Sequence, residues 1–85
     1  MRQVRAVFPD IARVVRATGI VELRALVDEN GSVTDVAVVR CTRPGVQFEI
    51  EADRAVRRFK YRPATRDGVP VKMWVTVRVN FGRSE

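Results

Sequence analysis

The chain has 85 residues and a formal net charge of +6, with 16 lysines and arginines against 10 aspartates and glutamates. It has no histidine and a single cysteine, Cys41, which excludes histidine-based catalysis, histidine metal ligands, an internal disulfide and a thiolate metal cluster. A chain of this length buries roughly 60–65% of its unfolded surface, so we expect one small domain over residues 1–85, with its core within about 8–81.

The first predicted element is a short amphipathic helix that opens at residues 8–10. Pro9 suits a first helical turn, where its missing N–H has no intrahelical partner, and Asp10 complements the positive end of the helix. The apolar residues that share one face at helical spacing are Ile11, Val14 and Val15. Gly19 is expected to end this segment.

The pattern then changes to an alternation of apolar and polar residues over residues 20–28, which predicts a β-strand. Asn30 and Gly31 are typical of a tight turn with positive φ, and a second strand follows from Ser32 to about Cys41. The apolar phase of this second strand shifts along its length. We therefore expect either a bulge near residues 34–35 or a strand that is covered in part on both faces.

Residues 47–59 return to helical spacing, with acidic residues in the first half and basic residues in the second, as the helix dipole favours. The apolar face of this helix consists of Phe48, Ala52, Ala55, Val56 and Phe59. A turn at residues 66–68 leads into the longest alternating run of the chain. One face of that run carries Val71, Met73, Val75, Val77, Val79 and Phe81, and the other carries Lys72, Trp74, Thr76, Arg78 and Asn80.

The order helix, strand, strand, helix, strand predicts an α+β fold. Its third strand runs parallel to the second, because the second helix reverses the chain. In a purely antiparallel sheet the third strand must therefore pair with the first, which gives the strand order 2-1-3 with both helices on one face. The long last strand then lies at an edge, where unpaired N–H and C=O groups invite a partner.

The residues resemble the TonB C-terminal domain family over about residues 8–81. The motifs that carry the resemblance are Phe8-Pro9, Gly19-Ile20-Val21, Val27-Asp28-Glu29-Asn30-Gly31-Ser32-Val33, Ala55-Val56-Arg57-Arg58-Phe59-Lys60-Tyr61-Arg62-Pro63-Ala64, Asp67-Gly68-Val69-Pro70-Val71 and the final strand to Phe81. The chain departs from the family pattern at Phe8, Ala25, Asp53 and Phe59. At Asp53 the family usually has an apolar helix residue.

The resemblance implies a periplasmic module of an energy transducer, which is not an enzyme and uses no cofactor or metal. In such proteins an N-terminal helix in the inner membrane, joined to an ExbB–ExbD-type motor, and a proline-rich linker would lie upstream of Met1. The domain would bind the TonB box of an outer-membrane transporter by strand addition. This contact would transmit work from the proton-motive force for the uptake of siderophores or vitamins.

Residues expected to bind the partner lie on the last strand and at the end of the second helix: Trp74, Val75, Thr76, Val77, Arg78, Val79, Asn80, Phe81, Arg57 and Arg58. Arginines among them could pair with acidic residues around the box. Arg57 and Arg58 are also ordinary basic residues for a helix end. Trp74 could serve partner contact or half-exposed packing, whereas Phe81 is expected in the core.

Two other functions fit parts of this pattern. The same module could bind peptide within a fusion protein of a different role. A basic α+β domain with an open sheet face also fits RNA binding, but the charges are scattered and Trp74 is the one strand aromatic off the helix-covered face. Exposed edge strands could in addition pair two copies into a homodimer.

Overall fold

The computed structural model describes residues 6–82. The elements in chain order are α1 (Asp10–Val14), β1 (Gly19–Val27), β2 (Val33–Cys41), α2 (Phe48–Val56), β3 (Ala64–Arg66), β4 (Val69–Val71) and β5 (Met73–Phe81). Strands β2, β1 and β5 form an antiparallel sheet in that order, and β3 and β4 form a separate hairpin. The predicted α+β fold with strand order 2-1-3 is confirmed, with β5 as the third strand.

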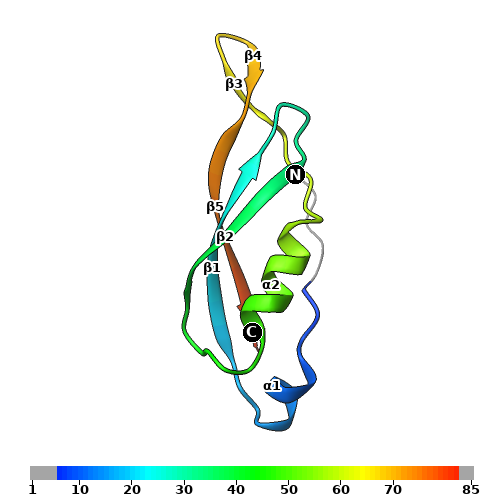
Figure 1. Ribbon diagram of the computed structural model, residues 1–85, viewed down its shortest axis with the longest axis vertical. Helices are drawn as coiled ribbons and strands as arrows, with labels where there is room; N and C mark the ends of the chain where they lie inside the picture. Colours follow the sequence, from blue (N-terminus) through cyan, green and yellow to red (C-terminus); the bar gives the residue numbers. More distant parts are fainter. Residues whose placement is uncertain (1–5, 83–85) are drawn as a thin grey trace.

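The molecule is elongated, with extents of 49 × 21 × 19 Å. In Figure 1, α2 lies over one face of the sheet, the β3–β4 hairpin projects beyond one end, and α1 lies at the other end. No helix within residues 6–82 has the length and apolar character that crossing a lipid bilayer requires.

The two edge strands pair with β1 in different ways. β5 pairs with β1 over nine consecutive residues without a register shift. β2 has two irregularities, because Leu26 pairs with Asp35 while Val27 pairs with Val33, and a second shift falls at Val39. The first irregularity confirms the bulge predicted near residues 34–35. Each bulge bends β2 and interrupts its ladder, so the two edges of the sheet are not equivalent.

The core lies between α2 and the sheet. The apolar face predicted for the second helix is confirmed, since all five of its residues are buried: Phe48, Ala52, Ala55, Val56 and Phe59. Phe48 is fully buried and stacks on Phe81 of β5, with ring centroids 4.4 Å apart. Phe8 packs edge-on against Phe48 at 5.6 Å, so one aromatic cluster joins the N-terminal segment, α2 and the end of β5.

The apolar face predicted for the first helix is wrong. Ile11, Val14 and Val15 are 44%, 81% and 50% exposed, whereas Ala12 and Ala17 are buried. The helix has only five residues, so its orientation is set by its flanking segments: Phe8 packs into the core before it, and β1 begins just after it. Gly19 is already the first residue of β1, and the chain leaves the helix through left-handed backbone at Arg16 (φ 56°).

The turn predicted at residues 66–68 is confirmed, but the long run after it is divided. Asp67 and Gly68 both have positive φ (52° and 80°), the combination that a type I′ hairpin turn requires. Val71 pairs with Ala64 in β4, and the chain passes Lys72 before β5 begins. The alternation of apolar residues continues through Lys72 because both strands are extended, so the sequence alone does not mark the break.

Tyr61 gives the fold a pH dependence at high pH. Partial burial raises the pKa of this phenol above its ordinary value of 10.0. The folded chain therefore holds the phenolic proton at a pH at which the unfolded chain has lost it. This contribution to stability is complete below pH 10 and is lost as the pH rises through the folded-state pKa.

We expect the free energy of unfolding to fall above pH 10, and to fall less in Tyr61→Phe. Urea denaturation at pH 8, 10 and 11 measures both chains. Because Tyr61 is the only tyrosine, tyrosinate absorbance in the wild type gives its folded pKa directly. Equal declines in the wild type and the Tyr61→Phe variant would show that this phenol does not contribute.

Candidate functional site

The free edge of β5 is the longest regular edge that the structure presents. β5 pairs with β1 on one side, and within residues 6–82 no strand pairs with it on the other. β2 forms the opposite edge, but its two bulges interrupt the regular spacing of main-chain groups. Bulges are one of the devices by which proteins protect sheet edges from pairing. An incoming strand would therefore find a regular template only at β5.

The hydrogen bonds of β1 identify which residues of β5 face outward. The Thr42 N–H donates to the Ile20 carbonyl oxygen at 3.0 Å, so Ile20 directs its main chain toward β2. Main-chain direction alternates along an antiparallel strand, so Val21 faces β5, where its register partner is Val79. The same alternation makes four residues of β5 present N–H and C=O groups to the free edge: Trp74, Thr76, Arg78 and Asn80.

The side chains beside this edge differ between the two faces of the sheet. The four residues with outward main-chain groups carry exposed side chains on the face that α2 leaves open. On the α2 face, Val77 and Phe81 are buried, Val75 and Val79 are half-buried, and Met73 is 49% exposed. An added strand would therefore contact a partly exposed apolar row on one face and mainly polar side chains on the other. The two faces predicted for the last strand are confirmed over Met73–Phe81, whereas Val71 and Lys72 lie outside β5.

Trp74 lies on the open face beside β1. The Arg24 guanidinium carbon lies 6.0 Å from the centroid of the Trp74 ring, and Arg24, Ala37 and Trp74 line a small groove of about 190 Å³. Trp74 is 41% exposed. Its ring thus packs against Arg24 and is also open to solvent. We therefore expect its fluorescence to change when a strand docks on β5.

Arg78 lies in the middle of the open face. Its register partner on β1 is Glu22, whose carboxylate lies 3.9 Å from Arg40 of β2. Within the described part of the chain, no carboxylate lies within 4.0 Å of the Arg78 guanidinium. Arg78 is therefore a basic side chain at the free edge with room for an acidic partner.

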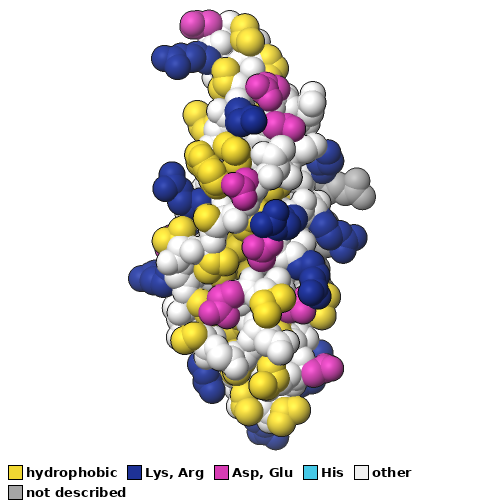
Figure 2. Space-filling model, viewed as in Figure 1, with side chains coloured by type: hydrophobic (Ala, Val, Ile, Leu, Met, Phe, Trp, Pro, Cys, Tyr) yellow, Lys and Arg dark blue, Asp and Glu magenta, His cyan; other side chains and the backbone are white. Residues whose placement is uncertain are grey.

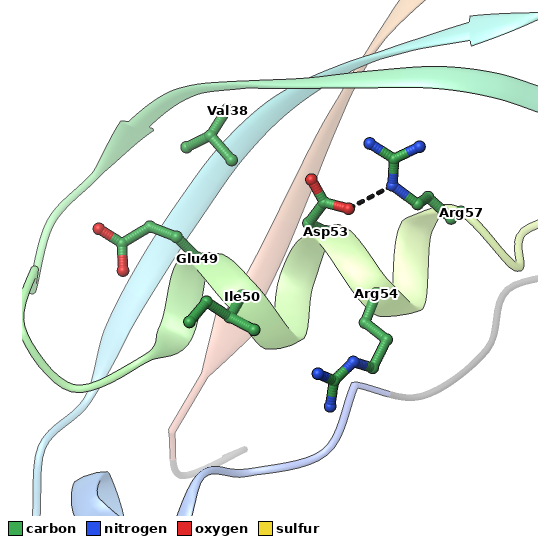
Figure 3. Close-up of a pocket in the computed structure, with 6 residues that line it drawn as sticks. All are labelled: Val38, Glu49, Ile50, Asp53, Arg54 and Arg57. Carbon is green, nitrogen blue, oxygen red and sulfur yellow. Dashed lines mark hydrogen bonds and ion pairs between the residues drawn. The ribbon is translucent and has the colours of Figure 1, made fainter.

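Arg57 lies just after α2, near β2, which is the edge strand opposite β5. Its Nε donates to the Asp53 carboxylate one helical turn earlier (Figure 3), and this hydrogen bond, together with the charge of Asp53, raises the pKa of Arg57. Both residues line an open groove of about 500 Å³ between α2 and Val38 of β2. Asp53, which departs from the family pattern, is explained by this ion pair, which its i, i+4 spacing to Arg57 indicates in the sequence.

The structure therefore brings together the eight predicted residues of the last strand but does not bring Arg57 to them. Arg58 is exposed just beyond α2, where its N–H donates to the Ala55 carbonyl oxygen. Figure 2 shows basic and acidic side chains interspersed over the α2 face. Among the described residues of that face, acidic side chains stand between the basic ones, unlike the continuous basic patch that suits a nucleic-acid backbone.

Known proteins share this architecture. The solution NMR structure of the Pseudomonas aeruginosa TonB CTD is similar to this chain with a TM-score of 0.77, over 100% of this chain and 85% of that chain, at 21% sequence identity. At this identity the likeness shows the fold. Among curated proteins no relative of the chain is found.

The sequence itself carries the family signature. The family described as Gram-negative bacterial TonB protein C-terminal matches residues 4–82, nearly the whole chain. This match covers α1, the three-stranded sheet, α2 and the β3–β4 hairpin together. The chain belongs to the TonB C-terminal domain family.

Proposed function

We propose that this domain binds the TonB box of an outer-membrane transporter by adding it as a strand to the free edge of β5. The observation that carries this proposal is the nine-residue edge, which has no bulge and no partner within residues 6–82. The domain would act in the periplasm, tethered to the inner membrane by a segment preceding the domain. Through that segment it would receive work from an ExbB–ExbD-type complex and pass it to a transporter of siderophores or vitamins.

Main-chain recognition would let one edge bind several partners. Each hydrogen bond to the outward main-chain groups contributes about 0.5–1.5 kcal/mol net and does not depend on the partner's side chains. The partly exposed apolar row of Met73, Val75 and Val79 supplies additional contact for alternate side chains of the docked strand. Affinity therefore comes mostly from the backbone, and selectivity comes from the residues beside it.

Basic side chains around the edge are proposed to add selectivity for acidic residues near the box. Arg78 is the best placed, since it belongs to the docking strand itself, is exposed, and has no carboxylate within 4.0 Å in the described chain. Arg57 and Arg58 remain candidates at longer range. Arg57 would have to share its guanidinium with Asp53. Because these side chains are exposed, we expect each such pair to add little to the affinity.

A proline at Thr76 tests the docking edge. Thr76 directs its N–H outward, so proline removes a docking donor while leaving the hydrogen bonds between β5 and β1 in place. We expect Thr76→Pro to lose TonB-box peptide binding and to remain folded. The single tryptophan, Trp74, lies two residues before Thr76 on the same strand, and its fluorescence follows the titration. Thr76→Val keeps the N–H and is the matched control, for which we expect binding within about threefold of the wild type.

A second experiment leaves the domain unchanged. Two box peptides carry N-methyl groups at alternate residues, one at the odd and one at the even positions. An added strand uses only one of these sets for hydrogen bonds to β5. We expect one peptide to bind with amide shifts along residues 74–81 and the other not to bind. Equal binding of both peptides, or shifts confined to β2, would overturn strand addition at β5.

A further inference from the structure

Two open grooves meet at the end of the sheet where β1 begins and β5 ends. The first, of about 370 Å³, is lined by Phe8, Arg13, Arg16, Ala17, Thr18 and Gly82. The second, of about 400 Å³, is lined by Thr18, Gly19, Ile20, Thr42, Asn80 and Gly82. Thr18 and Gly82 line both, so the two grooves adjoin each other at this end of the sheet, and together we call them the terminal groove.

The terminal groove is basic. Arg13 and Arg16 line it directly. Arg43 lies beside it, because the Cβ of Arg43 is 3.0 Å from the position that a Cβ on Gly19 would take, and Gly19 lines the groove. Arg13 lies 3.5 Å from Asp10. Within residues 6–82, no carboxylate lies within 4.0 Å of Arg16 or Arg43.

Arg16 is held at this surface by the way in which α1 ends. Its φ of 56° is left-handed, as is common for the residue that follows the C-cap residue of a helix. The bond from the Ala17 N–H to the Ala12 carbonyl oxygen, at 2.8 Å, closes the turn around it. This bond is the one that closes a Schellman helix end, so the capping of α1 fixes the backbone position of Arg16.

The terminal groove continues the docking edge. Asn80 directs its main chain outward from β5 and also lines the groove, and Gly82 follows the last residue of the strand. A strand docked along β5 therefore leads directly into the groove at one of its ends. The other end of β5 has mixed charge: Lys72 precedes Met73, and Met73 pairs with Val27, which is followed by Asp28 and Glu29.

We propose that the terminal groove binds an acidic segment of the partner that continues from the strand docked on β5. This proposal rests on the proposed function, because the docked strand delivers the segment to the groove. Arg16 lines the groove and Arg43 lies beside it, and within residues 6–82 neither has a carboxylate within 4.0 Å. Arg13 adds positive charge, and the Thr18 hydroxyl and Asn80 amide supply hydrogen-bond donors. The groove makes the domain select partners by the charge at one end of the docked strand.

Three synthetic peptides test this selection. They share a core of alternating valine and threonine, and carry three glutamates at the N-terminus, three glutamates at the C-terminus, or glutamines at both ends. The docked strand has one direction, so only one acidic peptide places its glutamates at Gly82. We expect that peptide to bind about three- to tenfold more tightly than the glutamine peptide in low salt, with the gain shrinking in high salt.

Variants of the domain test which arginines cause the tighter binding of the acidic peptide. In Arg16→Gln/Arg43→Gln the gain from glutamate should disappear, together with the amide shifts that the acidic peptide causes at Thr18 and Gly82. Arg62→Gln/Arg66→Gln removes the same charge from exposed residues in and beside the β3–β4 hairpin, and there the gain should persist.

The outcomes separate the two proposals. Strand addition stands if the glutamine peptide shifts the amides of residues 74–81. The proposal that the terminal groove binds an acidic segment is overturned if neither acidic peptide binds more tightly than the glutamine peptide, or if the gain in affinity survives in Arg16→Gln/Arg43→Gln. If no peptide binds the domain, both proposals fail. If an acidic peptide shifts Thr18 and Gly82 without shifting β5, the groove binds acidic chains by itself, and the claim that the docked strand delivers them is overturned.

Discussion

Replacing Phe48 with alanine is expected to lower the free energy of unfolding by about 3–5 kcal/mol. Phe48 is fully buried, stacks on Phe81 with centroids 4.4 Å apart and meets Phe8 edge-on. It is also the first residue of α2, so its ring holds the start of the helix to the end of β5. A cavity at this point disconnects three segments that are distant in the chain.

The size of the domain makes this loss severe. At about 0.05–0.15 kcal/mol per residue, a chain of this length has a total stability of roughly 4–13 kcal/mol. Urea denaturation followed by Trp74 fluorescence and by circular dichroism measures the change. Ile50→Ala is the matched control on the same helix, because Ile50 is 53% exposed. It should cost less than about 1 kcal/mol, and similar costs for the two variants would contradict the assigned core.

Gly31→Ala is expected to destabilise the domain by about 3 kcal/mol, from left-handed strain and the loss of one or two hydrogen bonds. Gly31 has φ 85°, and a Cβ there would lie 2.0 Å from the Tyr61 carbonyl oxygen. The Tyr61 N–H donates to the Gly31 carbonyl oxygen at 2.9 Å, and Ser32 bridges to Lys60 beside it. The added methyl group would separate the β1–β2 turn from the segment that leads out of α2.

Gly68→Ala separates backbone strain from this contact. Gly68 has a similar φ of 80°, but a Cβ there would meet nothing within 4 Å. Its replacement should cost only the left-handed strain, about 1 kcal/mol. Urea denaturation of both variants measures the difference. Equal costs at Gly31 and Gly68 would show that the approach of Tyr61 to Gly31 does not limit the residue at that turn.

The sequence predicts most of this fold because its patterns are local. The five apolar residues of α2 recur at helical spacing, and those of β1 and β5 alternate, so each element carries its own period. The hairpin turn at Gly31 fixes the antiparallel pairing of β1 and β2, and the reversal by α2 leaves β1 as the partner for β5. The first helix is the exception, because one turn of helix is too short for its period to decide which face is buried.

The candidate site is only partly visible in the sequence. Its position on the last strand follows from topology, since that strand has to lie at an edge. Which alternate residues face outward depends on the register of β5 against β1, and that register is set by contacts between residues that are distant in the chain, from Val27 with Met73 to Gly19 with Phe81. The position of Arg57 on the β2 side likewise depends on how α2 lies across the sheet.

Length, charge and the missing histidine exclude several chemistries, and the order of periodic segments determines an α+β sheet with a free last strand. The terminal groove is a product of tertiary structure alone, because Arg16, Arg43 and Asn80 come from three separate segments of the chain. Local periodicity records which side of each element is apolar. Only packing decides which polar side chains meet at the ends of those elements, since the residues that meet there share no pattern along the chain.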